Sequence, residues 1–179
     1  MIVLLCGLSG AGKTTLARTI KNKLDADGTS AEIIDGDEYR GNLFKELGYS
    51  REDRMENIRR MGFIARKFSR QGIVTIVSAI NPYAQARAEL LSRYPDVFTV
   101  HVDCPVDVLI GRDTKGFYAK ALLPDEHPDK IKNLTGINDQ FDIPATPDVY
   151  INTHVNSIDD CSNMLYNFII NAKKPVYEF

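Results

Sequence analysis

A chain of 179 residues, with 44% hydrophobic and 26% charged residues, has the composition of one globular domain. Its formal net charge of −2 argues against a broad basic surface for nucleic acid, and no run approaches the ~18 apolar residues of a membrane span. The cysteines Cys6, Cys104 and Cys161 are odd in number and far apart, which favours reduced thiols over disulfides. We therefore expect one soluble cytoplasmic domain over residues 1–179, with no nucleic-acid or membrane partner.

Short apolar runs alternate with helical patterns along the chain. Ile2–Cys6 lacks the basic flank of a signal peptide and leads into a Gly-rich turn, so we expect a buried strand there. Helical spacing follows over 16–24, and Ile58, Met61, Ile64, Ala65 and Phe68 form one face of a longer helix, which Gly72 ends. Further strands are predicted at 31–35, 73–80, 97–102 and 148–152, and further helices at 84–93 and 158–169.

Strands that are apolar throughout and alternate with helices indicate an α/β fold with a five-stranded parallel sheet covered on both faces. Ligands of such folds bind at the carboxyl ends of the strands. The long stretch 111–147 is rich in Lys, Asp, Pro and Gly. A stretch of this kind inside a compact domain is typical of a lid, or is partly helical.

The stretch "GLSGAGKTT" fits the P-loop pattern G-x-x-x-x-G-K-[ST] between a predicted strand and a predicted helix. Its glycines let backbone N–H groups surround phosphates at a helix N-terminus. We expect Lys13 to reach the β and γ phosphates of ATP and the Thr14 hydroxyl to bind Mg²⁺. The predicted ATP-binding residues are Gly7, Ser9, Gly10, Ala11, Gly12, Lys13, Thr14 and Thr15.

The stretch "DGDEYR" follows the second predicted strand, so it lies at the same sheet edge as the P-loop. A carboxylate there can orient an acceptor hydroxyl and take up its proton beside a metal ion. Asp37 is our candidate for this catalytic and metal-binding role. The competing interpretation is a solvated turn, because Asp-Gly is strong turn chemistry.

Four guanidinium groups, Arg40, Arg54, Arg59 and Arg60, lie in or beside "LGYSREDRMENIRR". Guanidinium pairs bidentately with phosphate or sulfate oxygens, although each arginine taken alone is more often a surface charge. Tyr49 is a candidate for stacking on a base and Asn57 for hydrogen bonding to a substrate. Ser50 and Asp53 also have the spacing of a helix N-cap box.

The lid stretch "GRDTKGFYAK" carries Arg112 and Lys115. Cations in a lid can neutralise charge on a transferring phosphoryl group, and the alternative is a solvated loop.

Together these motifs resemble the adenylylsulfate kinases, which phosphorylate the 3′-hydroxyl of adenosine 5′-phosphosulfate with ATP. The resemblance runs from Gly7 to about Pro147. It depends most on "DGDEYR" followed by "LGYSREDRMENIRRMGF", and on "RDTKGFYAKA" followed by "LTGINDQFDIP". It implies a P-loop kinase core with a mobile lid, and a homodimer.

The resemblance also implies roles for single residues. Asp37 falls near the acceptor hydroxyl and the metal ion, Lys115 in the lid, and Arg112 near the ATP base. Tyr49 falls where the family places a stacking Phe. The residues assigned to the acceptor nucleotide are Asp37, Arg40, Tyr49, Arg54, Asn57, Ile80, Lys115 and Leu134, and those assigned to catalysis are Asp37, Lys13 and Lys115.

The chain departs from the family pattern around the acceptor. Asn81 replaces a serine sometimes described as phosphorylated, so no phosphoserine role carries over. Leu122 replaces a lid arginine, Leu134 replaces the second aromatic residue of the adenine clamp, and Asn138 replaces an aspartate. The segment "LLPDEHPDK" is a short insertion. Losing one aromatic face weakens base stacking by about 1–3 kcal/mol.

Two alternatives therefore stay open. One is a paralogue with the same mechanism on another modified nucleotide, such as a cytidine diphosphoramidate. The other is a nucleotide-dependent switch, for which a late N-K-x-D motif is expected and "NTHVNSIDD" does not supply it.

Overall fold

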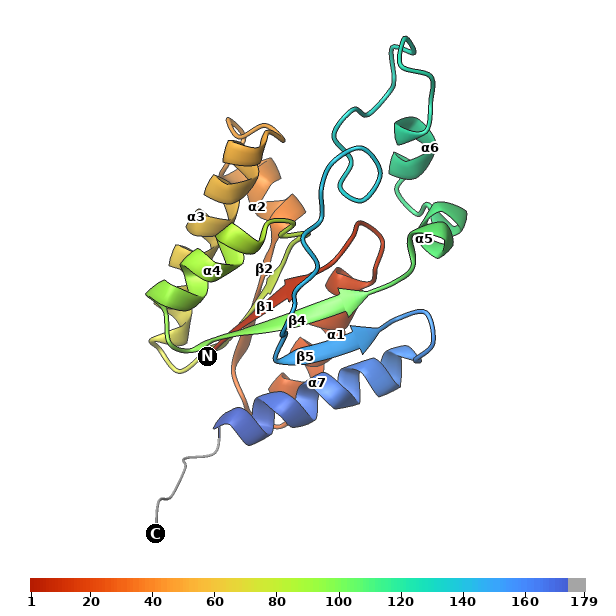
Figure 1. Cartoon of the computed structure of the whole chain (residues 1–179). Helices are drawn as coiled ribbons and strands as arrows, with labels where there is room; N and C mark the ends of the chain where they lie inside the picture. Colours follow the sequence, from red (N-terminus) through yellow and green to blue (C-terminus); the bar gives the residue numbers. More distant parts are fainter. Residues whose placement is uncertain (174–179) are drawn as a thin grey trace.

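The computed structural model describes residues 1–173, which form a parallel five-stranded sheet between two layers of helices (Figure 1). The strand order is β2-β3-β1-β4-β5, and every neighbouring pair is parallel. The strands are β1 (Ile2–Cys6), β2 (Ala31–Asp35), β3 (Val74–Ser78), β4 (Val97–Asp103) and β5 (Val149–Asn152). The chain leaves β1 toward β2 and later passes to β4 on the other side, so the carboxyl end of β1 is the topological switch point.

The predicted strands are confirmed, with one shortened at both ends. Strand β3 is shorter than the predicted range 73–80 because the flanking residues bond elsewhere. The Ile73 amide donates to the Phe68 carbonyl at the end of a helix, and the Ile80 carbonyl accepts from the Gly7 amide (3.1 Å). Hydrophobicity continues past the point where the ladder ends, which is why the sequence pattern overran it.

The helices are α1 (Lys13–Ala26), α2 (Gly36–Asn42), α3 (Arg51–Ser69), α4 (Ala84–Arg93), α5 (Val106–Arg112), α6 (Phe117–Ala121) and α7 (Ile158–Lys173). Helices α1 and α7 pack together on one face of the sheet, and α3 and α4 pack on the other (Figure 1). Helices α5 and α6 lie beyond the carboxyl end of β4. Asp37 therefore lies at the start of helix α2. The competing interpretation of this stretch was a solvated loop turn.

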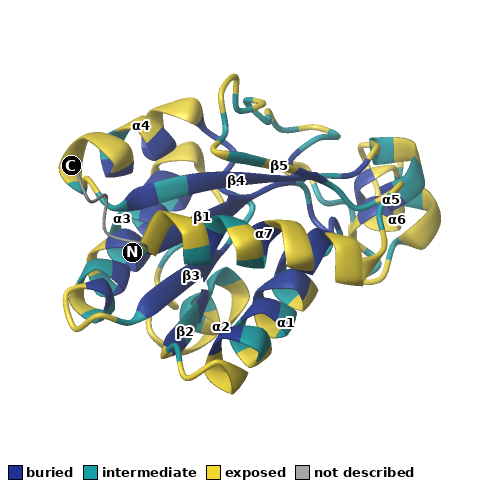
Figure 2. Cartoon of the chain, turned by 90° about the horizontal axis from the view of Figure 1, so that it is seen from below, coloured by how far each residue is buried: buried dark blue, intermediate teal, exposed yellow. Residues whose placement is uncertain are grey.

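The central strands of the sheet are buried on both faces, and β1 and β3 are dark along their whole length in Figure 2, whereas the edge strands β2 and β5 are partly exposed. Successive residues of β1 serve two hydrophobic clusters. Val3 and Leu5 pack with α1 and α7, whereas Ile2 and Leu4 pack with α3 and α4. This alternation across two covered faces explains why the strand is apolar at every position.

Helix α3 begins and ends as its sequence predicts. Ser50 is the N-cap, its Oγ accepting from the Asp53 amide (3.1 Å) and donating to the Asp53 carboxylate (2.9 Å). At the other end Gly72 adopts the left-handed conformation (φ +79°), which glycine takes at low cost.

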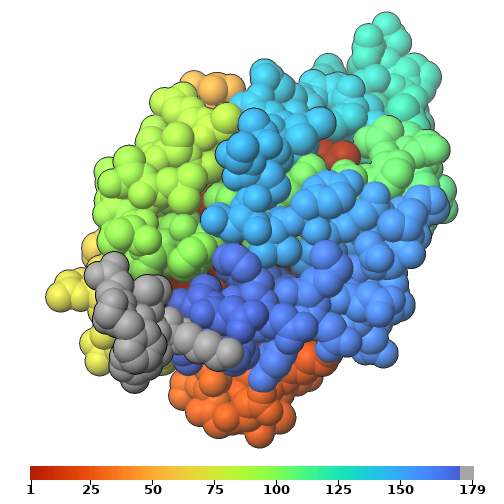
Figure 3. Space-filling model, turned by 60° about the horizontal axis from the view of Figure 1, so that its bottom comes forward, coloured from red at the N-terminus to blue at the C-terminus, as the bar shows by residue number. Residues whose placement is uncertain are grey.

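The segment 111–147 was expected to be a lid or to be partly helical, and the structure shows that it is partly helical. It contains the end of α5 and all of α6. Residues 122–147 carry only an isolated bridge between Thr135 and Asp139. In the space-filling view the lid residues near 120 project from the body of the molecule (Figure 3).

Across residues 1–173, no helix has the length and apolarity that a bilayer crossing requires.

Candidate active site

The P-loop connects β1 to α1 in a conformation that depends on two glycines. A Cβ on Gly7 would lie 2.1 Å from the Val102 carbonyl oxygen of β4, so no larger residue fits. Gly12 adopts a left-handed φ of +91° at the N-cap of α1. The turn thereby brings Lys13 and Thr14 to the first positions of the helix, where free N–H groups favour anions.

Lys13 is a buried cation in this loop. Its Nζ donates to the Leu8 carbonyl (2.7 Å), and the residue is only 8% exposed. Burial, aided by the nearby charge of Lys115, lowers the pKa of Lys13 to about 8. The carboxylates of Asp37 and Asp35 act in the opposite direction. An ammonium group that is buried away from water interacts more strongly with a bound phosphate than a solvent-exposed one does.

Thr14 contacts a carboxylate that the sequence reasoning missed. Its Oγ1 donates to Asp35 Oδ2 (2.8 Å) and lies 3.5 Å from Ser78 Oγ. Asp35 is the last residue of β2 and caps α2, accepting from the Asp37 amide (3.0 Å). Its position at a strand end in "DGD" was the available signal, which pointed equally to Asp35 and Asp37.

Asp37 and Lys115 meet although 78 positions separate them. Lys115 Nζ lies 2.5 Å from Asp37 Oδ2, and both side chains are substantially exposed. The lid thus contacts α2 beside the P-loop. Three predicted catalytic residues, Lys13, Asp37 and Lys115, are close enough for their charges to act on one another.

Three predicted acceptor residues also lie together. The guanidinium carbon of Arg40 lies 4.8 Å from the ring centroid of Tyr49, and that of Arg54 lies 5.5 Å from it. Arg54 Nε lies 3.5 Å from the Asp139 carboxylate of the lid. Tyr49 is 56% exposed, so its ring is accessible to a planar ligand.

The remaining acceptor candidates differ in their surroundings. Asn57 is buried one turn after Arg54, with its Nδ2 3.3 Å from Met61 Sδ. Ile80 is half-buried, and its carbonyl binds the P-loop. Leu134 is buried in the hydrophobic cluster that also contains residues of α1 and α7.

Arg59 and Arg60 do not join this group, and they follow the other interpretation offered for these arginines, that of surface charges. Arg59 pairs with Glu89 of α4 (2.7 Å), and Arg60 pairs with Glu56 (2.8 Å) and Glu46.

The other predicted ATP-binding residues contact several different elements. The Ser9 carbonyl accepts from the Tyr118 hydroxyl of α6 (2.8 Å), and the Ala11 carbonyl accepts from Thr153 Oγ1 (3.0 Å). Thr15 is exposed on α1. Arg112 ends α5 and lies 3.7 Å from Cys104 Sγ. The contact through Tyr118 couples the base of the lid to the loop.

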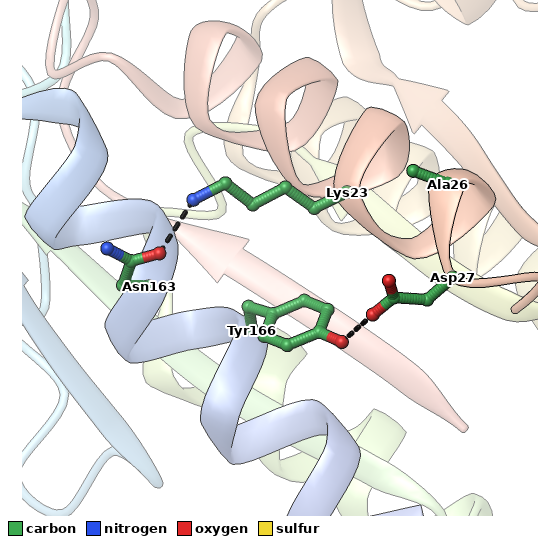
Figure 4. A pocket seen from close by; sticks show the side chains of 5 residues that line it. All are labelled: Lys23, Ala26, Asp27, Asn163 and Tyr166. Carbon is green, nitrogen blue, oxygen red and sulfur yellow. Dashed lines mark hydrogen bonds between the residues drawn. The ribbon is translucent and has the colours of Figure 1, made fainter.

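Two hollows lie outside this arrangement. One of about 370 Å³ is lined by Asp125, Lys130, Lys132 and Asn138 of the lid. The other, of about 300 Å³, lies between α1 and α7 (Figure 4). Its polar groups join the two helices, with Lys23 bonded to Asn163 (2.7 Å) and Tyr166 to Asp27. We therefore assign the second hollow to helix packing.

The comparisons with known proteins agree with this geometry. Residues 1–152 match the family model described as Adenylylsulphate kinase. The chain belongs to the adenylylsulphate kinase family. It is 47% identical to an adenylyl-sulfate kinase of Chloroflexus aurantiacus over 92% of this chain and 86% of that protein. It is 41% identical to a probable adenylyl-sulfate kinase of Synechocystis over 94% and 93% of the two chains.

A solved adenylylsulphate kinase has the same fold. The Mycobacterium tuberculosis APS kinase CysC in complex with AMPPNP and APS superposes with a TM-score of 0.88. The two chains are 34% identical, and the match covers 94% of this chain and 96% of that one. The expected family and the P-loop kinase fold are confirmed.

The departures from the family pattern have different surroundings. Leu122 is 56% exposed at the end of α6, whereas Asn81 is fully buried. Asn138 is built into the lid, its Oδ1 accepting from the Leu134 amide (2.7 Å) and its Nδ2 donating to the Ile131 carbonyl (2.8 Å). Asn138 thus holds the loop that carries Leu134.

Proposed function

We propose that this chain is an adenylyl-sulfate kinase, which transfers the γ-phosphoryl group of ATP to the 3′-hydroxyl of adenosine 5′-phosphosulfate. The observation that carries the proposal is the meeting of Asp37 and Lys115 (2.5 Å) beside the P-loop Lys13. This arrangement has the parts that phosphoryl transfer needs, namely a phosphate cradle, a carboxylate for the acceptor and cations for the transferring group. Family membership supplies the substrates.

On the donor side, Gly7, Ser9, Gly10, Ala11 and Gly12 present the backbone to the phosphates. Lys13 and Thr14 contact the phosphate chain, Thr15 supports the helix start, and Arg112 lies at the ATP base. The buried ammonium of Lys13 carries the largest electrostatic share, since it is already desolvated.

On the acceptor side, Asp37 receives the proton of the attacking 3′-hydroxyl and orients its oxygen. Lys115 moves from Asp37 to the transferring phosphoryl group when the substrates enter. Tyr49 stacks on the acceptor base. The other acceptor contacts are Arg40, Arg54, Asn57, Ile80 and Leu134.

A divalent cation fits the donor side. Thr14 Oγ1 and Asp35 Oδ2 are 2.8 Å apart, and hydroxyl and carboxylate oxygens suit Mg²⁺. Within residues 1–173 no group of three or more His, Cys, Asp and Glu side chains is placed to hold a metal. Mg²⁺ bound through one or two protein oxygens and nucleotide phosphates is the usual kinase arrangement. A bound Mg²⁺ would offset phosphate charge; Thr14 and Asp35 are the residues that would hold it, with Asp37 nearby.

One observation favours a second acceptor class. Leu134 is packed in the core, so Tyr49 is the aromatic ring available to a base at this position. A pocket with one aromatic face discriminates less strongly for adenine. The second candidate is therefore the same reaction on another modified nucleotide, such as a cytidine diphosphoramidate.

The setting of the enzyme follows from the same proposal. We place it in the cytoplasm, where ATP is available and the buried thiols Cys6, Cys104 and Cys161 stay reduced. We expect a homodimer, and light scattering during size-exclusion chromatography measures this directly.

The deciding experiment is ADP release from Mg-ATP with adenylyl sulfate, with a cytidine diphosphate derivative, and without acceptor. A parallel set with GTP tests the donor. We expect rapid release only with ATP and adenylyl sulfate together. Release only with the cytidine derivative would replace the acceptor, and release that ignores every acceptor would contradict a kinase.

A further inference from the structure

The carbonyl groups of the P-loop need hydrogen-bond partners of their own. A loop that directs its N–H groups at phosphates turns the carbonyls of the same peptide units away from them. The Leu8 carbonyl accepts from the Ala11 amide (3.2 Å), and the Gly12 carbonyl accepts from the Leu16 amide (2.9 Å), so these two are satisfied within the loop and α1. The carbonyls of Ser9 and Ala11 instead accept from side chains that lie far away in the sequence.

Tyr118 of α6 supplies the first distant donor. Its hydroxyl donates to the Ser9 carbonyl (2.8 Å), and the residue is only 2% exposed. The start of α6 is fixed by Asp113, whose carboxylate accepts from the amides of Tyr118 (3.0 Å) and Ala119 (2.8 Å). Because the ring is buried and the start of its helix is capped, the hydroxyl has a fixed position against the loop.

Thr153, directly after β5, supplies the second distant donor. Its Oγ1 lies 3.0 Å from the Ala11 carbonyl oxygen and 3.2 Å from the Asp103 carbonyl oxygen. The Thr153 amide donates to the same Asp103 carbonyl (2.9 Å), which fixes the backbone of the turn. A Cβ on Gly12 would lie 3.7 Å from Thr153 Cγ2, so the methyl group also faces the loop.

Both carbonyls belong to peptide units that precede a left-handed glycine. The φ angles are +77° at Gly10 and +91° at Gly12. Glycine adopts either sign of φ about equally readily, so the peptide unit before a glycine rotates at low cost. Rotation of the unit 9–10 or the unit 11–12 would turn a carbonyl oxygen toward the phosphates and an N–H group away from them. A hydrogen bond to the carbonyl from outside the loop opposes this rotation.

We propose that Tyr118 and Thr153 are positioning residues for ATP, whose hydroxyls hold the carbonyls of Ser9 and Ala11 outward and keep the adjoining N–H groups directed at the phosphates. Neither side chain touches a reacting atom in this role. The inference rests on the proposed function and deepens it, because it concerns how the same site holds its phosphoryl donor. Two segments outside the phosphate-binding motif thereby set the affinity for ATP.

The first test compares Thr153→Val with Thr153→Ser. Valine has nearly the shape of threonine but lacks the hydroxyl, whereas serine keeps the hydroxyl and lacks the methyl group. Thr99→Val is the control, because the Thr99 hydroxyl bonds to the Asp148 carboxylate (3.0 Å) instead of the loop. The measurements are Kd for AMPPNP by calorimetry without acceptor, KM for ATP and for adenylyl sulfate, kcat, and Tm.

We expect Thr153→Val to raise Kd for AMPPNP and KM for ATP about fivefold, the contribution of an ordinary hydrogen bond. The kcat and KM for adenylyl sulfate should stay within twofold, because the acceptor side is unchanged. Thr153→Ser should bind AMPPNP within twofold of wild type. Thr99→Val should lower Tm and leave Kd and both KM values unchanged, which is the pattern of a purely structural hydroxyl.

Tyr118→Phe is the second, independent test. It removes the other hydroxyl and keeps the buried ring, so we expect the same fivefold loss of affinity for AMPPNP. Tyr150→Phe is its control, because the Tyr150 hydroxyl donates to the Asp103 carboxylate (2.7 Å) and not to the loop. This control should bind AMPPNP as tightly as wild type.

Unchanged AMPPNP affinity in Thr153→Val and Tyr118→Phe would overturn the inference, and so would an equal loss of affinity in Thr153→Ser. A loss in only one of the two hydroxyl-free variants would overturn the role of the other residue. If one variant does not fold, the other decides. A wild-type enzyme that binds AMPPNP but releases no ADP with adenylyl sulfate would instead overturn the proposed function, while the AMPPNP comparison would still test the two hydroxyls.

Discussion

The P-loop is one continuous run of residues, whereas the acceptor side draws Arg40 from α2, Arg54 from α3 and Asp139 from the lid. On the donor side, Lys13 donates to the Leu8 carbonyl of the loop itself, and Gly7 of the loop packs closely against Val102 of β4. On the acceptor side, contacts between distant segments hold each group, and several buried polar atoms are unpaired. The phosphate-binding residues of the donor side are therefore neighbours in the chain, and the acceptor side depends on contacts between distant segments.

The largest expected effect is on the donor side. Lys13→Ala should reduce kcat by about 10³-fold or more, because the transferring phosphoryl group loses its desolvated cation. The Tm of the variant should be unchanged or slightly higher than that of the wild type, because a buried charge is removed. Steady-state ADP release and a melting curve check both parts, and substantial residual turnover would contradict the role of Lys13.

Asp37→Asn tests the catalytic carboxylate where the two sides meet. We expect kcat to fall about 10²- to 10³-fold with little change in KM for ATP, as for a group that acts in the transition state. Glu38→Gln on the next position of α2 is the matched control. An unchanged kcat for Asp37→Asn would move the base elsewhere, with Asp35 as the first alternative.

Asp35→Asn tests the carboxylate that hydrogen-bonds to Thr14. We expect the Mg²⁺ concentration for half-maximal rate to rise about 10- to 100-fold, because the cation loses one of the two protein oxygens proposed to hold it. The N-cap of α2 is preserved, because asparagine also caps helices. Titration of activity with Mg²⁺ measures the shift, and an unchanged curve would separate Asp35 from the cation.

Tyr49→Ala sharpens the comparison on the acceptor side. We expect KM for adenylyl sulfate to rise about tenfold through the loss of base stacking, with KM for ATP unchanged. Tyr49→Phe keeps the ring and should stay within twofold of wild type. If Tyr49→Phe raised KM for adenylyl sulfate as much as Tyr49→Ala does, the hydroxyl would matter rather than the stacking face.

The smallest effect is a proton taken up on nucleotide binding. Burial lowers the pKa of Lys13 to about 8, and bound phosphates raise it. At pH 8 ATP binding should take up about half a proton, which calorimetry in buffers of different ionisation enthalpy detects. Lys13→Ala should abolish the uptake, and a wild-type binding enthalpy independent of buffer would contradict it.

The same pKa has a consequence for the ligand-free protein. Below about pH 8, Lys13 is charged in both the folded and the unfolded chain, so its burial penalty is full. Above this pH the folded chain releases the proton first, and the free energy of unfolding gains a favourable contribution up to about pH 10.5. This contribution is absent from Lys13→Ala.

The sequence by itself determined the features whose causes are local. The P-loop follows from glycines at fixed spacing, the N-cap of α3 from Ser50 and Asp53, and the parallel sheet from apolar strands alternating with helices. Each depends on residues near one another in the chain, and their patterns are therefore visible in the letters.

Only the tertiary structure decided which side chains share a site. It paired Lys115 with Asp37, set Asp35 against Thr14, and directed Arg59 and Arg60 to glutamates instead of a ligand. It also left the Asn81 side chain buried, with no hydrogen-bond partner among residues 1–173. Such outcomes depend on long-range packing and on the competition of each charge for its partners, and neither is encoded in the spacing of residues along one segment.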